Sequence, residues 1–167
     1  GQNIGFLAPL SGTVGSAQTG ARAGIPALAV SQGLGEPDYP ASVGAAMAWL
    51  DDHPAALQDG TEPVQVSSIN APPRTEGSNR GVVEVPWDGT AGTDIGTQDC
   101  TSTVENPKSD VEAFNNGFIS LSILPNDFPD AEEPAPTTTT APPSSADNAP
   151  SSNDNAPAAT PLKPTFT

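Results

Sequence analysis

The first apolar segments of the chain predict a short helix followed by a buried strand. Residues 13–23 combine small and apolar residues in a pattern typical of a helix, with Ser11 as the expected N-cap. Gly24 follows at the position where a left-handed residue ends many helices. Ile25–Val30 is then an almost unbroken apolar run, with a proline near its first position, where a strand tolerates one.

A second helix is predicted over residues 39–57. Val43, Met47 and Leu50 recur there at helical spacing, which indicates one apolar face. The His-Pro pair at residues 53–54 is expected to end or kink this helix, because a residue before proline disfavours the helical conformation.

Three further apolar segments predict strands. Residues 64–69 and 118–124 alternate between apolar and polar positions, and residues 82–85, Val-Val-Glu-Val, form a short strand. Residues 110–116 are expected to form a helical turn with Asp110 as its N-cap. Alternating helices and strands imply an α/β layered domain, although the strands are too few for a complete doubly wound sheet.

The composition changes sharply near residue 129. Residues 1–128 carry nearly all the aromatic and β-branched apolar residues, and we expect them to form the folded domain. Residues 129–167 are rich in Pro, Ala, Ser, Thr and Asn, and they contain too little apolar surface to offset the entropy of ordering. We therefore expect a disordered tail that serves as a linker or as an extracellular stalk.

The charge of the chain limits its partners. Five Lys and Arg stand against 20 Asp and Glu, which gives a formal net charge of −15. A nucleic-acid polymer or an anionic membrane would require a basic surface, so we expect neither as a partner. The single Cys and single His leave no cluster that would suggest zinc.

The stretch Ser11-Gly12-Thr13 is the first candidate for chemistry. The start of a helix offers free backbone N–H groups and a positive dipole end, and both favour a phosphate or a carboxylate. Gly12 would let a ligand approach the backbone closely, and the hydroxyls of Ser11 and Thr13 could hydrogen-bond to phosphate oxygens. A simple helix cap is the alternative interpretation of the same residues.

The second candidate is Asn3, in the stretch GQNIG that begins the chain. An Asn between two glycines is typical of a turn in which its side chain bonds to its own backbone. The alternative is that the Asn3 amide points into a site shared with Ser11 and Thr13.

These stretches together resemble the SurE family of survival-protein nucleotidases. GQNIG is followed, eight residues after its Asn, by SGTVGSAQTGARAGIPALAVS. The family carries Gly-x-Asn-x-Gly, a short spacer, Ser-Gly-Thr-Val-Gly-Ala-Ala, and Gly-Ile-Pro-Ala-Leu-Ala-Val-Ser. Weaker similarities, in DYPASVGAAMAWL, SSINAPP and the closing SDVEAFNNGFISLSILPND, extend the resemblance to about residue 127.

The resemblance implies a Rossmann-like three-layer fold and a phosphomonoesterase that hydrolyses nucleoside 5′- or 3′-monophosphates with a divalent metal, Mg²⁺ or Mn²⁺. Asn3, Ser11, Gly12 and Thr13 fall on family active-site positions, where they would bind and orient the phosphate. The family's metal ligands, an Asp-Asp pair, a Ser and an Asn, align before Gly1. We therefore expect an incomplete domain with an upstream metal-binding half, and no metal ligand in this chain.

Assembly and location are also expectations at this point. The resemblance suggests a homo-oligomer, either a dimer or a tetramer. The tail, together with a DCTST stretch similar to secreted family members, suggests a secreted or periplasmic protein in which Cys100 would pair with an upstream Cys. The alternative function is a non-catalytic secreted binding or structural module with a stalk-like tail.

Overall fold

The computed structural model describes residues 1–74, 76–92 and 98–128 of the chain. The expected disordered tail, residues 129–167, lies outside these described residues. The described elements, in chain order, are the 3₁₀ helix η1 (Gly5–Leu10), α1 (Gly12–Arg22), β1 (Ala27–Gln32), α2 (Tyr39–Asp52), α3 (Pro54–Asp59), β2 (Val66–Ala71), β3 (Val82–Glu84), α4 (Asp110–Asn115) and β4 (Ile119–Leu124).

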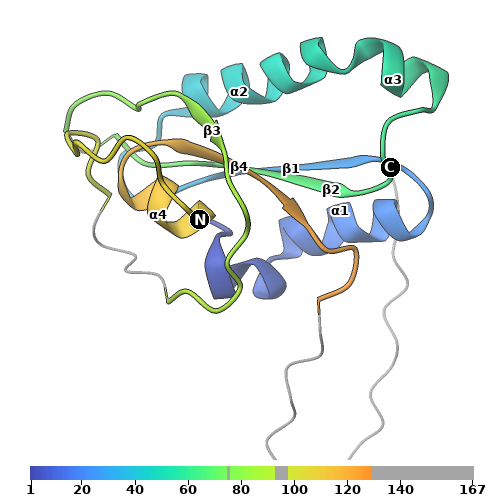
Figure 1. Cartoon of the computed structure of the whole chain (residues 1–167), viewed down its shortest axis with the longest axis horizontal. Coiled ribbons are helices and arrows are strands. Elements are labelled where there is room, and N and C mark those ends of the chain that lie inside the picture. Colours follow the sequence, from blue (N-terminus) through green and yellow to red (C-terminus); the bar gives the residue numbers. More distant parts are fainter. Residues whose placement is uncertain (75, 93–97, 129–167) are drawn as a thin grey trace, which may run out of the picture. The chain divides into compact units, whose positions relative to one another are not determined.

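A four-stranded sheet with the order β1-β2-β4-β3 forms the middle layer. β1 and β2 are parallel, β4 is antiparallel to β2, and β3 is parallel to β4. Helix α1 covers one face of the sheet, while α2 and α3 lie over the other (Figure 1). The predicted α/β layered fold is therefore confirmed, as a three-layer arrangement around a mixed sheet.

The end of α1 explains why β1 begins later than the sequence predicts. Gly24 has φ +82° and the N–H of Ile25 donates to the carbonyl of Gly20, a pairing that closes the helix as a Schellman motif. Ile25 thus belongs to the helix end, is 59% exposed, and is no strand residue. The strand starts at Ala27, directly after Pro26, and reaches Gln32.

The predicted break in the second helix is confirmed. α2 ends at Asp52, and α3 begins at Pro54, where a missing N–H is tolerated in the first turn. His53 lies between the two helices, and its ring stacks on Trp49 with 4.4 Å between ring centroids.

The apolar face predicted for α2 is not its buried face. Val43, Met47 and Leu50 are 59%, 51% and 41% exposed. The face that packs on the sheet consists of small residues and one tryptophan: Ser42, Ala45 and Trp49. Short side chains bring the helix close to β1 and β2, so the larger apolar residues are left on the outer side.

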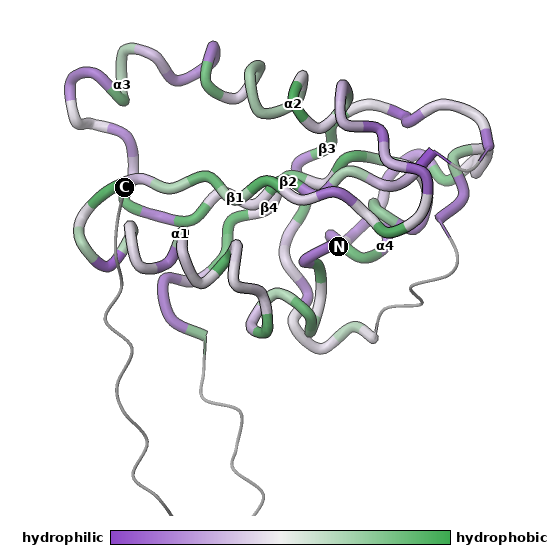
Figure 2. Tube along the Cα trace, turned by 180° about the vertical axis from the view of Figure 1, so that it is seen from behind, coloured by the Kyte–Doolittle hydropathy of each residue, from purple (hydrophilic) through white to green (hydrophobic). Residues whose placement is uncertain are grey.

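β2 is buried along its whole length, which the sequence did not indicate. All six of its residues are buried, its polar positions included, although the pattern over residues 64–69 alternates between apolar and polar positions. The reason is its central position, with helices on both faces. Figure 2 shows apolar residues running through the strands of the middle layer.

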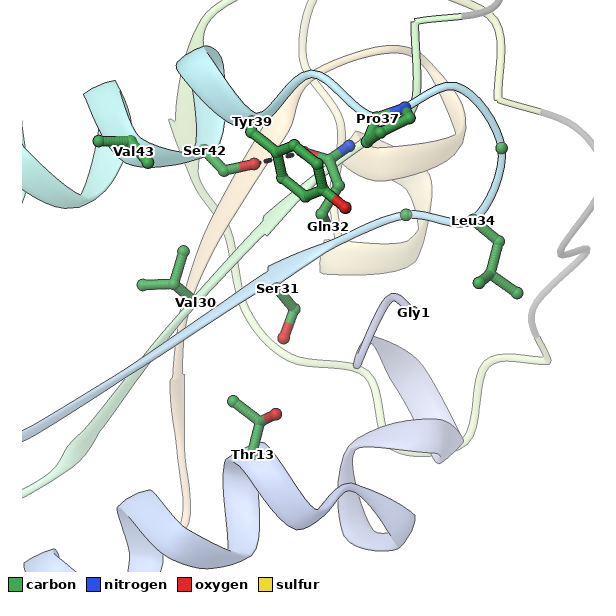
Figure 3. Close-up of a pocket in the computed structure, with 12 residues that line it drawn as sticks. Gly1, Thr13, Val30, Ser31, Gln32, Leu34, Pro37, Tyr39, Ser42 and Val43 are labelled. Carbon is green, nitrogen blue, oxygen red and sulfur yellow. Dashed lines mark hydrogen bonds between the residues drawn. The ribbon is translucent and has the colours of Figure 1, made fainter.

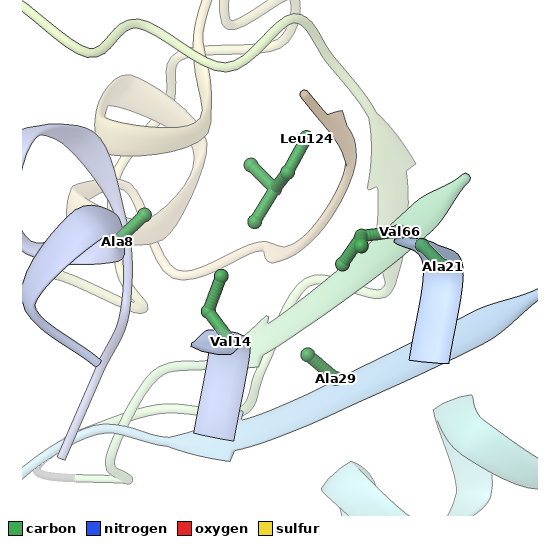
Figure 4. Packing of buried hydrophobic residues seen from close by; sticks show 6 residues of the cluster. All are labelled: Ala8, Val14, Ala21, Ala29, Val66 and Leu124. Atoms are coloured by element: carbon green, nitrogen blue, oxygen red, sulfur yellow. The ribbon is translucent and has the colours of Figure 1, made fainter. Parts of the chain in front are cut away.

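The core lies on both sides of this strand. On the α1 side, a buried cluster joins the helix to the sheet and comprises Ala8, Val14, Ala21, Ala29, Val66 and Leu124 (Figure 4). On the α2 side, the buried cluster comprises Ala45, Trp49, Ile69, Ala71 and Ile119. The two clusters hold both helix layers against the sheet through burial of apolar surface.

Two local details differ from the prediction. η1 was not predicted. Ser109, rather than Asp110, caps α4, because the Ser109 hydroxyl accepts a hydrogen bond from the N–H of Glu112. Among the described residues, no helix is long and apolar enough to cross a membrane.

Substitution of Gly33 provides a test of the close packing at the end of β1. A Cβ at Gly33 would lie 2.5 Å from Cδ of Pro73 and 2.7 Å from Cζ of Phe114, so Gly33→Ala should lower the free energy of unfolding by about 1–3 kcal/mol. Gly44→Ala in α2 is the matched control, because its Cβ would meet nothing within 4 Å. We expect that variant to be as stable as the parent or more stable, since Ala favours a helix. Urea unfolding followed by Trp fluorescence measures both, and equal effects would contradict the packing.

Candidate functional site

The N-terminal segment lies against the carboxyl end of the sheet. The N–H of Asn3 donates to Oδ1 of Asn70 at 2.7 Å, and Nδ2 of Asn70 donates back to the carbonyl of Asn3 at 3.4 Å. Asn70 is 2% exposed and also bonds to Ser68. A buried amide needs such partners, so Asn70 fixes the position of the chain start at the end of β2.

The side chain of Asn3 points toward β1. Its Nδ2 donates to Oγ of Ser31 at 2.5 Å. Among the described residues, the hydrogen bonds of Asn3 therefore join it to β1 and β2. In a simple turn, its side chain would instead bond to the backbone of neighbouring residues. Ser31 is a buried residue near the carboxyl end of β1.

The start of α1 is capped as predicted, and part of it is left free. Oγ of Ser11 accepts from the N–H of Val14 at 3.2 Å, and the carbonyl of Ser11 accepts from the N–H of Gly15 at 2.8 Å. Within the described part of the chain, no group accepts from the N–H of Gly12 or of Thr13. These two donors, with the helix dipole behind them, form a local positive end.

The space in front of this helix start is open. A Cβ added at Gly12 would meet nothing within 4 Å, and Thr13 is exposed. A ligand can therefore approach the backbone of the first turn. The expectation that Gly12 allows close approach is compatible with this geometry.

A cavity of about 500 Å³ connects the start of α1 with the end of β1 and the start of α2. Figure 3 shows Thr13 on the α1 side and Tyr39 on the α2 side, with Ser31 on the strand between them. Ligands commonly bind at this place in α/β proteins, outside the carboxyl ends of the strands. The structure thus brings Thr13 to the same cavity as Ser31, the partner of Asn3.

Among the described residues, no charged side chain lines this cavity. The start of α1 contributes a positive dipole end, Gly1 with its amino group also lies in the lining, and the formal charge of the whole chain is −15. The described residues also contain no group of three or more His, Cys, Asp or Glu placed to hold a metal ion.

Asp110 holds the segment that follows Asn3. It is 2% exposed, its Oδ2 accepts from the N–H of Gly5 at 2.8 Å, and its Oδ1 accepts from the N–H of Asp88 at 2.9 Å. Burial raises the pKa of this carboxyl, and the backbone N–H groups act in the opposite direction. The side chain predicted to be a helix cap is instead a buried link between the chain start and the loop before α4.

Sequence reasoning missed Ser31, Asn70 and Asp110 as residues of this region. The predicted strands ended at Val30 and Ile69, one residue before Ser31 and Asn70 in each case. The polar residues that follow two adjacent parallel strands were the available clue, because the carboxyl ends of such strands meet at one edge. Asp110 left no comparable clue, since its partners are distant in sequence.

The fold is thus that of an α/β protein in which a helix start lies beside a cavity at the carboxyl ends of parallel strands, a place where such proteins commonly bind ligands. The chain belongs to the SurE family: the family described as survival protein SurE matches residues 1–98. Two proteins named 5′-nucleotidase SurE, from two strains of Leptospira biflexa serovar Patoc, are each 36% identical over 80 residues. The aligned part is 47% of this chain and 31% of those proteins, so the chain spans about a third of their length.

A solved structure shares the fold. The crystal structure of the SurE protein from Aquifex aeolicus superposes with a TM-score of 0.54 at 22% sequence identity, covering 78% of this chain and 57% of that one. This likeness supports the three-layer architecture.

Removal of the Asp110 carboxylate should destabilise the domain. Asp110→Ala leaves the N–H groups of Gly5 and Asp88 without their acceptor, and we expect a loss of about 2–4 kcal/mol in the free energy of unfolding. Asp127→Ala is the control, because the Asp127–Arg22 pair is exposed and should contribute less than about 1 kcal/mol. Urea unfolding of both variants measures the difference, and similar losses would show that Asp110 is not a structural link.

Proposed function

We propose that this chain forms the phosphate-binding side of a nucleotidase, a phosphomonoesterase that hydrolyses nucleoside 5′- or 3′-monophosphates. The observation that carries the proposal is the start of α1, where the N–H groups of Gly12 and Thr13 are free beside a cavity. Membership of the SurE family and the names of the Leptospira relatives support the nucleotidase assignment. The 3′ activity rests on the resemblance of the sequence motifs to the family.

Each predicted site residue then has a defined task. The N–H groups of Gly12 and Thr13 donate to phosphate oxygens, and the Thr13 hydroxyl adds a third donor. Ser11 keeps the helix start in place through its cap to Val14. The Asn3 side-chain amide donates to Ser31, which lines the cavity, and in this proposal it orients the phosphoryl group. Preorganised donors of this kind stabilise negative charge on a phosphoryl group as it reacts.

A divalent cation, Mg²⁺ or Mn²⁺, is part of the proposal. Such an ion acts as a Lewis acid on phosphoryl oxygens and would offset the charge of a phosphate dianion in an acidic protein. Among the described residues no group of three or more His, Cys, Asp or Glu is placed to hold a metal ion. The resemblance to the family assigns the ligands to positions upstream of Gly1. We therefore give the residues of this chain no role in metal binding. A secreted or periplasmic location and a homo-oligomeric state stay predictions from the sequence.

Phosphate binding at the start of α1 can be tested without turnover. In ¹H–¹⁵N spectra of the chain, AMP with Mg²⁺ should shift the amide signals of Gly12 and Thr13 because their N–H groups donate to the phosphate. Gly12→Ala should weaken this binding about tenfold or more, since its methyl group occupies the open space where the ligand approaches. Gly15→Ala lies one turn along the same helix, where a Cβ also meets nothing within 4 Å, and should bind AMP as the parent does.

Unmoved signals at the start of α1 with millimolar AMP would contradict the phosphate site. That outcome would favour the alternative, a non-catalytic binding or structural module. Equal weakening by Gly12→Ala and Gly15→Ala would show that the helix as a whole, and not its first turn, is affected.

A separate prediction about catalytic activity follows from the assignment of the metal ligands to positions outside this chain. The 167-residue chain should release no phosphate from AMP or from a chromogenic phosphomonoester with Mg²⁺ or Mn²⁺, because the ligands are assigned outside it. Colorimetric phosphate release measures this. Turnover that EDTA abolishes would show that the chain supplies its own metal ligands.

A further inference from the structure

The wall of the cavity opposite Thr13 has a different chemical character from the start of α1. It is formed by Leu34, Pro37, Tyr39 and Val43, from the β1–α2 loop and the first turns of α2 (Figure 3). Leu34, Tyr39 and Val43 are 59%, 64% and 59% exposed, so their apolar surfaces have little cover within the domain. Large apolar residues gathered on the wall of a cavity are typical of a ligand site.

The polar groups of the cavity floor are already engaged. Ser31 accepts from the Asn3 amide, and the amide nitrogen of Gln32 donates to the carbonyls of Ala71 and Pro72. The amide oxygen of Gln32 accepts from the hydroxyl of Ser42. On the α2 side, the cavity therefore offers a ligand mainly apolar contact. On the α1 side, it offers free hydrogen-bond donors.

The loop that carries the wall is held in place before any ligand binds. The N–H of Leu34 donates to Oε1 of Gln2 at 3.2 Å, and the N–H of Gly33 donates to the carbonyl of Ala71 at 2.8 Å. The side chain of Asp38 caps α2 directly before Tyr39. A fixed wall loses little entropy when a ligand binds, and this favours recognition of a flat, rigid group.

We propose that Leu34, Pro37, Tyr39 and Val43 bind the base of the nucleotide, while the start of α1 binds its phosphate. The ligand would lie across the carboxyl end of β1, with Ser31 between its two ends. The volume of about 500 Å³ lies within the range of about 300–1,000 Å³ for small-molecule pockets. The wall then selects nucleotides over phosphate esters that lack an aromatic group. This inference rests on the proposed function.

The chain contains one tyrosine, which gives a direct reporter for the wall. Protein labelled with fluorotyrosine shows a single ¹⁹F signal from Tyr39. Adenosine and AMP should shift this signal, because stacking of a base changes the surroundings of the ring. Ribose 5-phosphate and inorganic phosphate, which lack a base, should leave it in place.

Variants on the exposed face of α2 separate ligand contact from general effects. Tyr39→Ala and Val43→Ala should each weaken adenosine binding, and Tyr39→Ala by about tenfold, as expected for a lost base–aromatic contact. Met47→Ala is the matched control, because Met47 is 51% exposed on the same helix but does not line the cavity. Amide titrations measure binding by the variants.

The outcomes distinguish this inference from the proposed function. An unmoved Tyr39 signal with millimolar adenosine and AMP, together with shifted Gly12 and Thr13 amides, would overturn the base site and leave the phosphate site standing. No response at either place would overturn both. A Tyr39 signal that moves with protein concentration and not with adenosine would show that a second copy covers the wall, and would also overturn the inference.

Discussion

The hydrogen bonds between the Asn70 side chain and the backbone of Asn3 are the contact on which the site depends. Asn70 is enclosed at the end of the central strand, so its amide has to find partners inside the protein. It finds them in the N–H and the carbonyl of Asn3, and this brings the first residues across the carboxyl end of the sheet. Asp110 fixes the backbone that follows Asn3, because its carboxylate accepts a hydrogen bond from the N–H of Gly5. The direction of the Asn3 side chain toward Ser31 follows from these two buried anchors.

The two ends of the cavity beside these residues differ in polarity. At the α1 end, Gly12 and Thr13 present N–H groups that lack partners among the described residues, and the helix adds a fractional positive charge. At the α2 end, Tyr39 and its neighbours present apolar surface. An amphiphilic ligand with one anionic end matches this arrangement better than either a simple anion or an apolar molecule. A fractional charge balances a phosphate dianion only in part, which is why the proposal includes a cation.

Much of the fold could be predicted from the sequence, and the errors have identifiable causes. All four strands and the helix break at His53 were predicted. The first two strands were predicted to begin two residues too early. For β1 the reason is that Ile25 takes part in the end of α1, so the strand begins only after Pro26. The large apolar residues that indicated α2 lie on its outer side, whereas small residues and Trp49 pack on the sheet. Spacing alone indicates that a helix is amphipathic and leaves open which face is covered.

The sequence by itself determined the features that depend on neighbouring residues. The Ser11 cap and the Gly24 helix end involve backbone groups within one turn, so their residue types are sufficient to predict them. The tertiary structure alone decided which polar residues meet at the site. Asn3 and Asn70 are 67 residues apart, and Gly5 and Asp110 are 105 apart. No local pattern specifies such pairs, because they form only when the packed sheet encloses a polar group that must be satisfied.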